Sequence, residues 1–310
     1  MKNIITKSII TKDIAIRNNG NRVAIIPIFV PHAGCPHDCV FCNQRRITAH
    51  SEASTLEEIH KIVDRNLTTI HAKNHAKEDI HTEIAFFGGS FTAIDVAEQE
   101  QYLGIAKELK AVGKIDGIRI STRPDCIDDV VIARLKSYDV DLVELGAQSF
   151  DDDVLIASNR GHSTSDVACA MKRLKAAGFQ TGLQLMVGLP GDTKAKSIES
   201  ARRAAALSPD VARIYPVVVL KDTALADQMC DGRYIPWAEL EMVDTVKEMY
   251  KILTESGANV IRVGLKSTDN IRNDSESVLS DYHPAFFELV LSEIALETMI
   301  RVFDAQNRDE

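Results

Sequence analysis

Short runs of β-branched and apolar residues alternate along this chain with longer stretches in which apolar residues recur every three to four positions. The short runs predict strands, and the longer stretches predict helices that bury one face. Strands that alternate with helices form parallel sheets with helices packed on them. The sequence therefore predicts an α/β fold, a partial (β/α)6 TIM-type barrel of parallel strands. We expect strands at residues 23–30, 83–87, 117–121, 141–147, 181–187 and 211–220, and helices at 55–74, 97–112, 127–137, 165–177 and 194–207.

The alternation changes after residue 220. A helix is predicted at 237–256, a short strand at 259–263 and a last helix at 284–303. We therefore divide the chain into residues 1–223, which form the barrel and carry a cysteine loop at 35–42, and residues 224–310. The second part is predicted to be a C-terminal α/β extension that completes or caps the barrel.

The charge and the apolar runs limit the partners of the chain. Its apolar run at residues 23–31 is far too short to span a bilayer, and residues 1–20 mix charges with isoleucine. We therefore expect a cytoplasmic protein with no membrane partner and no secretory leader. The formal net charge of −9 argues against a broad nucleic-acid-binding surface, although it is compatible with a local basic patch.

Three of the six cysteines fall within the eight residues CPHDCVFC, as Cys35, Cys39 and Cys42. The loop follows the first predicted strand directly, so it is expected at the C-terminal edge of the sheet, where α/β barrels carry their chemistry. Three thiolates suit an iron-sulfur cluster, zinc or copper(I). The other cysteines, Cys126, Cys169 and Cys230, stand alone and are expected to be small buried hydrophobic residues.

The spacing of the three cysteines leaves two interpretations open. A closed ferredoxin-type site takes four cysteines, and the loop offers three, which favours a metal centre with one open coordination position. The alternative is a structural Cys3His zinc site, with His37 or His32 as the fourth ligand, in a zinc-binding interaction module.

The motif C-x3-C-x2-C with an aromatic residue before its last cysteine, here Phe41, resembles the cluster loop of the radical S-adenosylmethionine (SAM) superfamily. The resemblance implies that Cys35, Cys39 and Cys42 bind one 4Fe-4S cluster, whose fourth iron is chelated by SAM. It also implies reductive cleavage of SAM to a 5′-deoxyadenosyl radical that abstracts hydrogen from a substrate.

Further segments resemble the SAM-binding strands of the same superfamily. FFGGSFT at 86–92 has the glycine pair that meets the SAM amino group, and Arg160 in SNRGH stands where the superfamily pairs with the SAM carboxylate. In RISTRPD at 119–125 a serine stands where most relatives hold the ribose with glutamate. LVELGAQSF at 142–150 and LQLMVGLPGDT at 183–193 resemble strands that pass SAM. The SAM-binding residues that the resemblance implies are Phe41, Gly88, Gly89, Ser90, Ser121, Gln148, Arg160, Gln184 and Met186.

The sixth predicted strand, RIYPVVVLKDT at 213–223, is similar to the same strand in the Elongator catalytic-subunit branch of the superfamily. The sequences of the fourth and fifth strands are also similar to those of oxygen-independent coproporphyrinogen oxidase. The chain ends at Glu310, so it resembles a stand-alone bacterial-type relative of that branch, without room for an acetyltransferase domain. The resemblance implies an oxidoreductase or transferase with an external electron donor of the flavodoxin or ferredoxin type. The substrate is either RNA, such as tRNA, or a small molecule such as a tetrapyrrole.

Seven basic residues are candidates for a positive field at the mouth of the barrel, suited to substrate phosphate or carboxylate groups. They are Arg45, Arg46, Arg123, Arg213, Lys221, Arg262 and Lys266.

Overall fold

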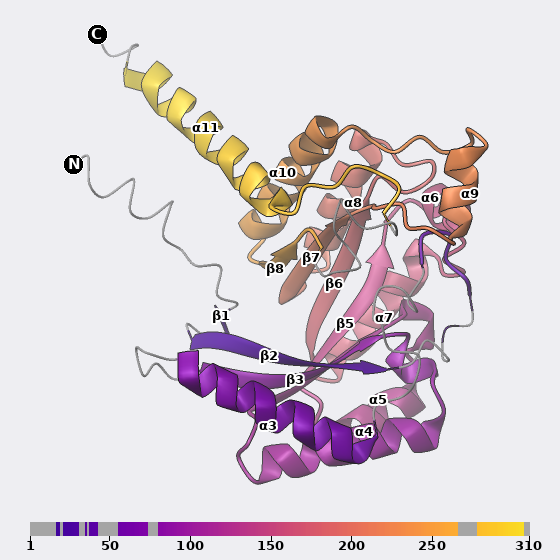
Figure 1. Cartoon of the computed structure of the whole chain (residues 1–310), viewed down its shortest axis with the longest axis vertical. Coiled ribbons are helices and arrows are strands. Elements are labelled where there is room, and N and C mark those ends of the chain that lie inside the picture. The colour runs from indigo at the N-terminus through magenta and orange to yellow at the C-terminus, as the bar shows by residue number, and fades with distance from the viewer. Residues whose placement is uncertain are drawn as a thin grey trace.

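The computed structural model describes residues 17–18, 21–30, 35, 37–42, 55–73, 80–265 and 278–306. Within these described ranges, eight strands form one sheet in the sequential order β1 to β8. The antiparallel β1 pairs with β2, and β2 to β8 are parallel, so the sheet curls into an open half-barrel (Figure 1). The strands are β1 Arg17–Asn18, β2 Asn21–Val30, β3 Ile80–Gly88, β4 Gly117–Thr122, β5 Leu142–Gln148, β6 Gln180–Val187, β7 Val211–Pro216 and β8 Asn259–Val263.

Helices cover the outer face of this half-barrel (Figure 1). Several of them begin at a side-chain cap, as Asp95, Asp128 and Thr193 show by accepting a backbone N–H of the first turn. The helices are α3 Leu56–Lys73, α4 Val96–Ala111, α5 Asp129–Ser137, α6 Asp152–Ala157, α7 Thr164–Ala176, α8 Lys194–Ala206, α9 Ala224–Cys230, α10 Glu239–Glu255 and α11 Phe286–Gln306, with short 3-10 helices η2 Phe91–Ala93 and η3 Pro124–Cys126.

The predicted α/β half-barrel is confirmed, with three local differences. The strand predicted at 211–220 ends at Pro216, beyond which Leu220 forms only a single antiparallel bridge with Val278. The strand predicted in the extension, β8, pairs in parallel with β7 and adds a seventh parallel strand to the sheet. Helices α6 and α9 were not predicted, because six and seven residues are too few to establish a helical period. The boundary at residue 223 remains a prediction.

The two faces of the sheet differ because side chains alternate along each strand. Ile84 and Phe86 of β3 are fully buried against helical residues such as Ile59 and Leu103, in the main hydrophobic core. The opposite face of the same strands lines the inside of the half-barrel and carries polar side chains. We therefore look for functional polar side chains on this inner face.

Four buried charged residues on the inner face are linked in a chain of ion pairs, which we call the floor: Glu83, Arg119, Glu144 and Arg213. Arg119 donates from Nε to Glu83 Oε2 at 2.8 Å and from Nη1 to Glu144 Oε1 at 3.1 Å. Arg213 donates from Nη2 to Glu144 Oε1 at 2.9 Å and from Nη1 to the hydroxyl of Tyr215 at 3.2 Å. Burial alone would raise the pKa of Glu144, but the two guanidinium groups outweigh it and lower that pKa.

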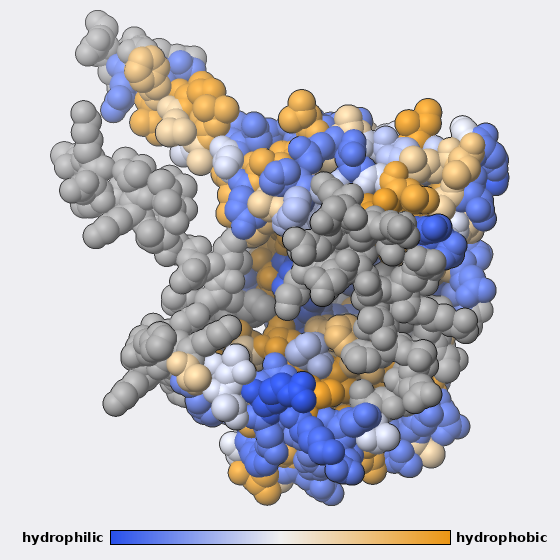
Figure 2. Space-filling view, in the orientation of Figure 1, coloured by the Kyte–Doolittle hydropathy of each residue, from blue (hydrophilic) through white to orange (hydrophobic). Residues whose placement is uncertain are grey.

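The last helix, α11, projects away from the body of the half-barrel (Figure 1). Glu297 ties it to α10 by ion pairs with Lys247 and Lys251. Its outer end exposes apolar side chains, including Met299 and Phe303, and Figure 2 shows an apolar surface there. No helix in the described part of the chain is long and apolar enough to cross a membrane.

Candidate functional site

The cysteine loop starts where β2 ends, beside the glycine that ends β3. Val30 and Gly88 are register partners, so the loop leaves the sheet at its C-terminal edge, as predicted. Gly88 has a φ of +115°, and a Cβ atom there would lie 2.6 Å from the carbonyl oxygen of Val30. Only glycine fits this position, because any side chain would collide with the backbone from which the loop departs.

The loop is fixed to segments that are distant in sequence. The N–H of Val40 donates to the carbonyl of Ser158 at 3.2 Å, and the carbonyl of Val40 accepts from the N–H of Leu225 at 2.8 Å. Asn159 Nδ2 donates to the carbonyl of Asp38 at 2.7 Å. The two short helices that were not predicted, α6 and α9, therefore supply the anchors of the loop.

An apolar cluster lies beneath the same loop. Val40 is buried in it together with Val154 of α6 and Leu225 of α9. Phe41 and Met186, both predicted to contact SAM, are partly buried and pack against this cluster. Their packing makes one wall of the region around the cysteines apolar.

The three cysteines differ in exposure. Cys39 is buried, Cys35 and Cys42 are half-buried, and the N–H of Cys42 donates to the carbonyl of Cys39 at 3.0 Å in a tight turn. Among the described residues, no three His, Cys, Asp or Glu side chains converge closely enough to hold a metal ion. Burial raises the pKa of the Cys35 thiol, against the opposing effect of the backbone N–H of Ser90 and of two nearby guanidinium groups.

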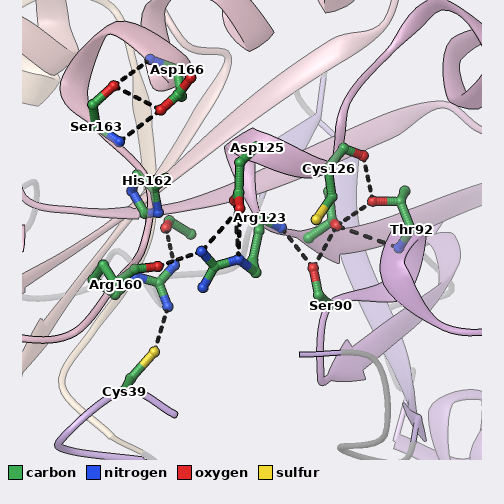
Figure 3. Close-up of polar contacts among 12 residues, drawn as sticks. Cys39, Ser90, Thr92, Arg123, Asp125, Cys126, Arg160, His162, Ser163 and Asp166 are labelled. Atoms are coloured by element: carbon green, nitrogen blue, oxygen red, sulfur yellow. Dashed lines mark hydrogen bonds and ion pairs between the residues drawn. The ribbon is translucent and has the colours of Figure 1, made fainter. Parts of the chain in front are cut away.

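Those two guanidinium groups belong to Arg160 and Arg123 (Figure 3). Arg160 donates from Nη1 to Cys39 Sγ at 3.1 Å and from Nη2 to the carbonyl of Gly146 at 2.6 Å. Arg123 donates from Nε and Nη2 to Asp125, at 3.0 and 3.1 Å, and from Nη2 to the carbonyl of Arg160. The structure thus places the guanidinium of Arg160, and the ion pair of Arg123 with Asp125, beside the cysteine loop.

Four buried side-chain polar atoms in the described part of the chain have no hydrogen-bond partner, and all of them lie in this region. They are Arg123 Nη1, Ser158 Oγ, Arg160 Nε and His162 Nδ1. Buried polar groups are normally paired, because each unpaired group retains the cost of its desolvation. Their concentration beside the cysteines indicates a place that a polar ligand completes.

Two histidines border this region. His162 donates from Nε2 to the carbonyl of Ala147 at 3.2 Å, and burial, together with the charge of Arg160, lowers its pKa to about 4. His37 lies over Gly161, where a Cβ atom would come within 2.3 Å of the imidazole ring. His32, the other candidate zinc ligand, lies outside the described residues.

Hydroxyl groups join the ends of β3 and β4 (Figure 3). The hydroxyl groups of Ser90 and Thr122 are 3.0 Å apart, those of Thr92 and Thr122 are 2.6 Å apart, and Thr92 Oγ1 donates to the carbonyl of Cys126 at 2.7 Å. Ser90 Oγ also accepts from the N–H of Arg123 at 3.1 Å. The network fixes Ser90 and Arg123 relative to each other, although it was not predicted.

The expectation that the three isolated cysteines are buried is wrong for two of them. Cys169 and Cys230 are exposed, because they lie on the solvent side of α7 and at the end of α9. Cys126 is half-buried and close to Ser90.

The remaining residues that were predicted to contact SAM lie on the inner face of the sheet or at the C-terminal ends of its strands. Gln184 Nε2 donates to Gln148 Oε1 at 3.2 Å, and Gln148 has a φ of +66° where the register between β5 and β6 shifts. Gly146 was not predicted, yet a Cβ atom there would lie 2.9 Å from Gln148 Nε2 and 3.4 Å from Arg160 Nη2. Half-buried Ser121 is on β4, and Gly89 is buried directly after β3.

Three of the seven candidate basic residues, Arg45, Arg46 and Lys266, lie outside the described residues. Arg213 is buried in the floor, where Glu144 neutralises it. Arg123 is paired with Asp125. These two residues therefore give the mouth little free positive charge.

The chain matches the family described as "Radical SAM superfamily" over residues 29–204 and the "Radical_SAM C-terminal domain" over residues 209–295. The first match covers more than half of the chain, and the chain belongs to the radical SAM superfamily. It is therefore a radical SAM enzyme, and the cofactors of the superfamily are a 4Fe-4S cluster and SAM. Such enzymes also need a reductant and a substrate.

Curated relatives include a tRNA uridine(34) acetyltransferase of Dehalococcoides mccartyi (strain CBDB1), 27% identical over 80% of this chain and 62% of the relative. A protein of the same name from Methanocaldococcus infernus is 25% identical over 74% of this chain and 50% of that protein. The heme chaperone HemW of Bacillus subtilis is 25% identical over 76% of this chain and 64% of HemW. The chain thus spans about half to two thirds of the length of these relatives.

Two solved structures have the same fold. The Elp3 of Methanocaldococcus infernus gives a TM-score of 0.68 at 19% identity, over 89% of this chain and 63% of that one. Coproporphyrinogen III oxidase (HemN) of Escherichia coli gives a TM-score of 0.54 at 19% identity, over 79% of this chain and 55% of that one.

The residues beside the loop fit these cofactors. Three cysteine thiols within eight residues are a donor set for iron-sulfur ligation. The adjacent arginines suit the negative charge of a thiolate-bound cluster, and their unpaired N–H groups suit a carboxylate ligand.

Proposed function

We propose that Cys35, Cys39 and Cys42 hold the cluster and that SAM binds between the cysteine loop and the inner face of the half-barrel. The observation that carries this proposal is the position of the loop at the C-terminal strand ends, where Arg160 contacts Cys39 Sγ at 3.1 Å. The other residues that we propose to line the SAM site are Phe41, Gly88, Gly89, Ser90, Ser121, Gln148, Gln184 and Met186.

The protein side of the reaction is binding, orientation and exclusion of water. Bound together, the cluster and SAM supply a 5′-deoxyadenosyl radical for hydrogen abstraction. Gly88 and Gly89 let the backbone approach the ligand closely, and the amides of Gln148 and Gln184 offer polar groups on the inner face. Val40, Phe41 and Met186 give the apolar wall that keeps water away from a reactive species.

We propose an RNA substrate containing uridine, with tRNA as the first choice. The support is that two curated relatives with similarity over most of this chain bear the name tRNA uridine(34) acetyltransferase. The net charge of −9 means that RNA contact must be local. A tetrapyrrole is the second candidate, supported by the similarity to HemW. The proposed electron donor is a small flavodoxin or ferredoxin.

The test starts with anaerobic reconstitution of the chain with iron and sulfide. A radical SAM enzyme is expected to bind about four irons per chain, absorb broadly in the visible blue and release 5′-deoxyadenosine from SAM after reduction. A colourless protein with one tightly held zinc would instead establish the zinc-binding module and end the proposal.

The substrate is tested separately with deuterium. The holoenzyme is incubated with SAM, reductant and either bulk tRNA labelled at uridine carbon positions or a labelled porphyrinogen. Transfer of deuterium into 5′-deoxyadenosine from one substrate and not from the other identifies the substrate class. Transfer from neither would overturn both substrate proposals while leaving SAM cleavage intact.

A further inference from the structure

Two phenylalanines lie side by side on the inner face of the half-barrel, near the ends of β2 and β3. Phe29 and Phe87 are register partners in these parallel strands, so their side chains project from the same face of the sheet. The neighbours of Phe29 along β2, Ile28 and Val30, are buried in the main core on the other face. Phe29 is 37% exposed and Phe87 is half-buried. The two rings therefore leave aromatic surface exposed inside the half-barrel.

The opposite wall of the half-barrel reaches Phe87 across the interior. The guanidinium carbon of Arg213, on β7, lies 4.8 Å from the centroid of the Phe87 ring. Three strands separate β3 from β7 in the sheet, so the curl of the half-barrel brings the two residues together. Arg213 is held in turn by its ion pair with Glu144. The Phe87 ring is thus fixed from below, which suits it to stack against a planar ligand.

Tyr215 follows Arg213 on the same face of β7 and has a hydroxyl proton to offer. Its hydroxyl oxygen lies 3.2 Å from Arg213 Nη1. A guanidinium can only donate, so the tyrosine oxygen is the acceptor in this bond and its own O–H points elsewhere. Among the described residues, no acceptor for this O–H is found. The hydroxyl group is therefore available to donate to a carbonyl oxygen of a ligand.

The adjacent strand β8 supplies a guanidinium group. Arg262 is the register partner of Arg213 and is half-buried, so it also belongs to the inner face. Unlike Arg213, it forms no ion pair or hydrogen bond with another residue in the part of the chain that the structure describes. The sequence predicts Arg262 as a source of positive field at the mouth, and its position agrees with a contact to an anionic group of a substrate.

We propose that these side chains form a subsite for one unpaired uridine of the RNA substrate. Phe29 and Phe87 stack the base, and the hydroxyl of Tyr215 donates to a carbonyl oxygen of its ring. Arg262 pairs with the adjacent phosphate. An enzyme that acts on a base must first take it out of the stack, and a single extruded base can enter a half-barrel that a duplex cannot. This inference rests on the proposed function, since it places the substrate on which the radical acts.

Binding of an RNA hairpin with uridines in its loop tests the stacking surface without turnover. The Kd is measured by fluorescence anisotropy on the oxidised holoenzyme with SAM. We expect Phe29→Ala to raise the Kd about tenfold, and Phe29→Tyr, which keeps an aromatic face, to stay within about threefold of wild type. Phe303→Ala, at an exposed position on α11, is the matched control and is expected to bind like wild type.

A second substitution keeps the test of Phe29 decisive. Phe29→Leu retains an apolar side chain without an aromatic face, and it replaces Phe29→Ala if that variant does not fold. A Kd within about twofold of wild type in the folded variant would contradict stacking on Phe29. Equal losses in Phe29→Leu and Phe29→Tyr would also contradict it, because only the tyrosine can stack.

Two further variants test the polar contacts of the subsite. Tyr215→Phe removes only the hydroxyl group, and we expect the Kd to rise about fivefold. Arg262→Gln is expected to reduce the slope of the logarithm of the binding constant against the logarithm of salt concentration by about 0.7, the value for one phosphate of a single strand. Arg202→Gln is the control and is expected to keep the wild-type slope, since Arg202 pairs with Glu199 on the surface of α8. An unchanged Kd in Tyr215→Phe together with an unchanged slope in Arg262→Gln overturns the subsite.

A photocrosslink needs no variant and locates the base directly. The hairpin carrying 5-iodouridine in its loop is irradiated with wild-type holoenzyme, and the adducts are mapped by mass spectrometry. Adducts on peptides that contain Phe29, Phe87 or Tyr215 support the subsite, and adducts confined to other peptides contradict it. Binding of a porphyrinogen that Phe29→Ala weakens, without any binding of the hairpin, would assign this surface to a tetrapyrrole and overturn the RNA subsite.

Failure of the subsite can be distinguished from failure of the proposed function. A wild-type chain that holds no cluster or does not cleave SAM would reject the proposed function. SAM cleavage together with RNA binding that none of these variants weakens would reject the subsite alone.

Discussion

The inside of the half-barrel contains two groups of buried charges that are built differently. In the floor, Arg119 and Arg213 share the carboxylate of Glu144, and Arg119 also reaches Glu83. At the mouth, Arg123 and Arg160 lie beside the cysteine loop. The four unpaired buried polar atoms of the described residues all lie at the mouth, and none belongs to the floor.

This difference suggests that the buried charges of the floor stabilise the fold, whereas the buried polar groups of the mouth bind a ligand. Buried ions remain in a native structure when they are paired and hydrogen-bonded, as those of the floor are. Among the residues that the structure describes, the mouth retains donors and acceptors without a hydrogen-bond partner, at a cost in stability. We interpret that cost as a sign of function, because a bound anion and cluster would remove it. Four predictions test this contrast, in order of decreasing effect.

The first concerns the mouth. Cys39→Ala is expected to abolish cluster binding and 5′-deoxyadenosine formation together, because it removes one of three proposed ligands and the acceptor of the Arg160 hydrogen bond. Iron and sulfide analysis and chromatography of the reaction products measure both losses. Cys169→Ala, at an exposed position on α7, is the control and is expected to retain both. Retention of colour and cleavage in Cys39→Ala would refute the ligand assignment.

The second concerns the floor. Glu144→Gln keeps the shape of the side chain but leaves two buried guanidinium groups undercompensated, so we expect the free energy of unfolding to fall by about 3–5 kcal/mol. Urea unfolding measures the change. Lys61→Ala, which breaks the exposed pair with Glu57 on α3, is the control and is expected to cost less than about 1 kcal/mol. Equal effects of the two changes would show that the floor is not a stabilising element.

The third prediction uses pH at the mouth. Burial, together with Arg160, lowers the pKa of His162 from 6.5 to about 4, so the unfolded chain binds more protons than the folded chain between these values. The contribution of His162 to the free energy of unfolding is therefore complete above pH 6.5 and falls by on the order of 3 kcal/mol as the pH drops to about 4. His162→Gln, which keeps an N–H donor for Ala147, is expected to lack this part of the acid loss. Urea unfolding across this pH range compares the two proteins, and identical pH dependence would contradict the prediction.

The fourth compares two glycines. Gly88→Ala is expected to destabilise the protein by about 1–3 kcal/mol, because its φ of +115° and the carbonyl of Val30 at 2.6 Å reject a Cβ atom. Gly104→Ala, inside α4 with nothing within 4 Å of an added Cβ, is expected to stabilise it by up to about 1 kcal/mol. Thermal unfolding of the apo proteins measures both. An equal shift in both variants would mean that the β2–β3 edge tolerates a side chain.

Much of the fold was predictable because it follows from local periodicity. Residues that alternate or recur every three to four positions identified the long helices and the parallel strands, and the cysteine spacing identified the loop. The exposed positions of Cys169 and Cys230 were predicted wrongly, because a cysteine carries no local signal of which helix face it occupies. The short helices α6 and α9 were missed for a related reason, since too few residues define a period.

The role of individual arginines was less predictable than their presence. The sequence indicates SAM-binding roles for the segments 119–125 and 158–162, and in the structure Arg123 and Arg160 of these segments lie beside the cysteine loop. No local pattern indicates that Arg160 contacts the sulfur of Cys39, or that Arg213 pairs with Glu144 in the floor. These partners lie between 69 and 121 residues away along the chain.

The sequence by itself determined the βα alternation, the position of a three-cysteine loop after the first strand and the superfamily, because each depends on residues that are neighbours along the chain. Only the tertiary structure decided which buried charges are satisfied and which are not. Hydrogen-bond satisfaction depends on the distance between side chains of different strands, and curling of the sheet sets those distances. The contrast between floor and mouth therefore exists only in the folded protein.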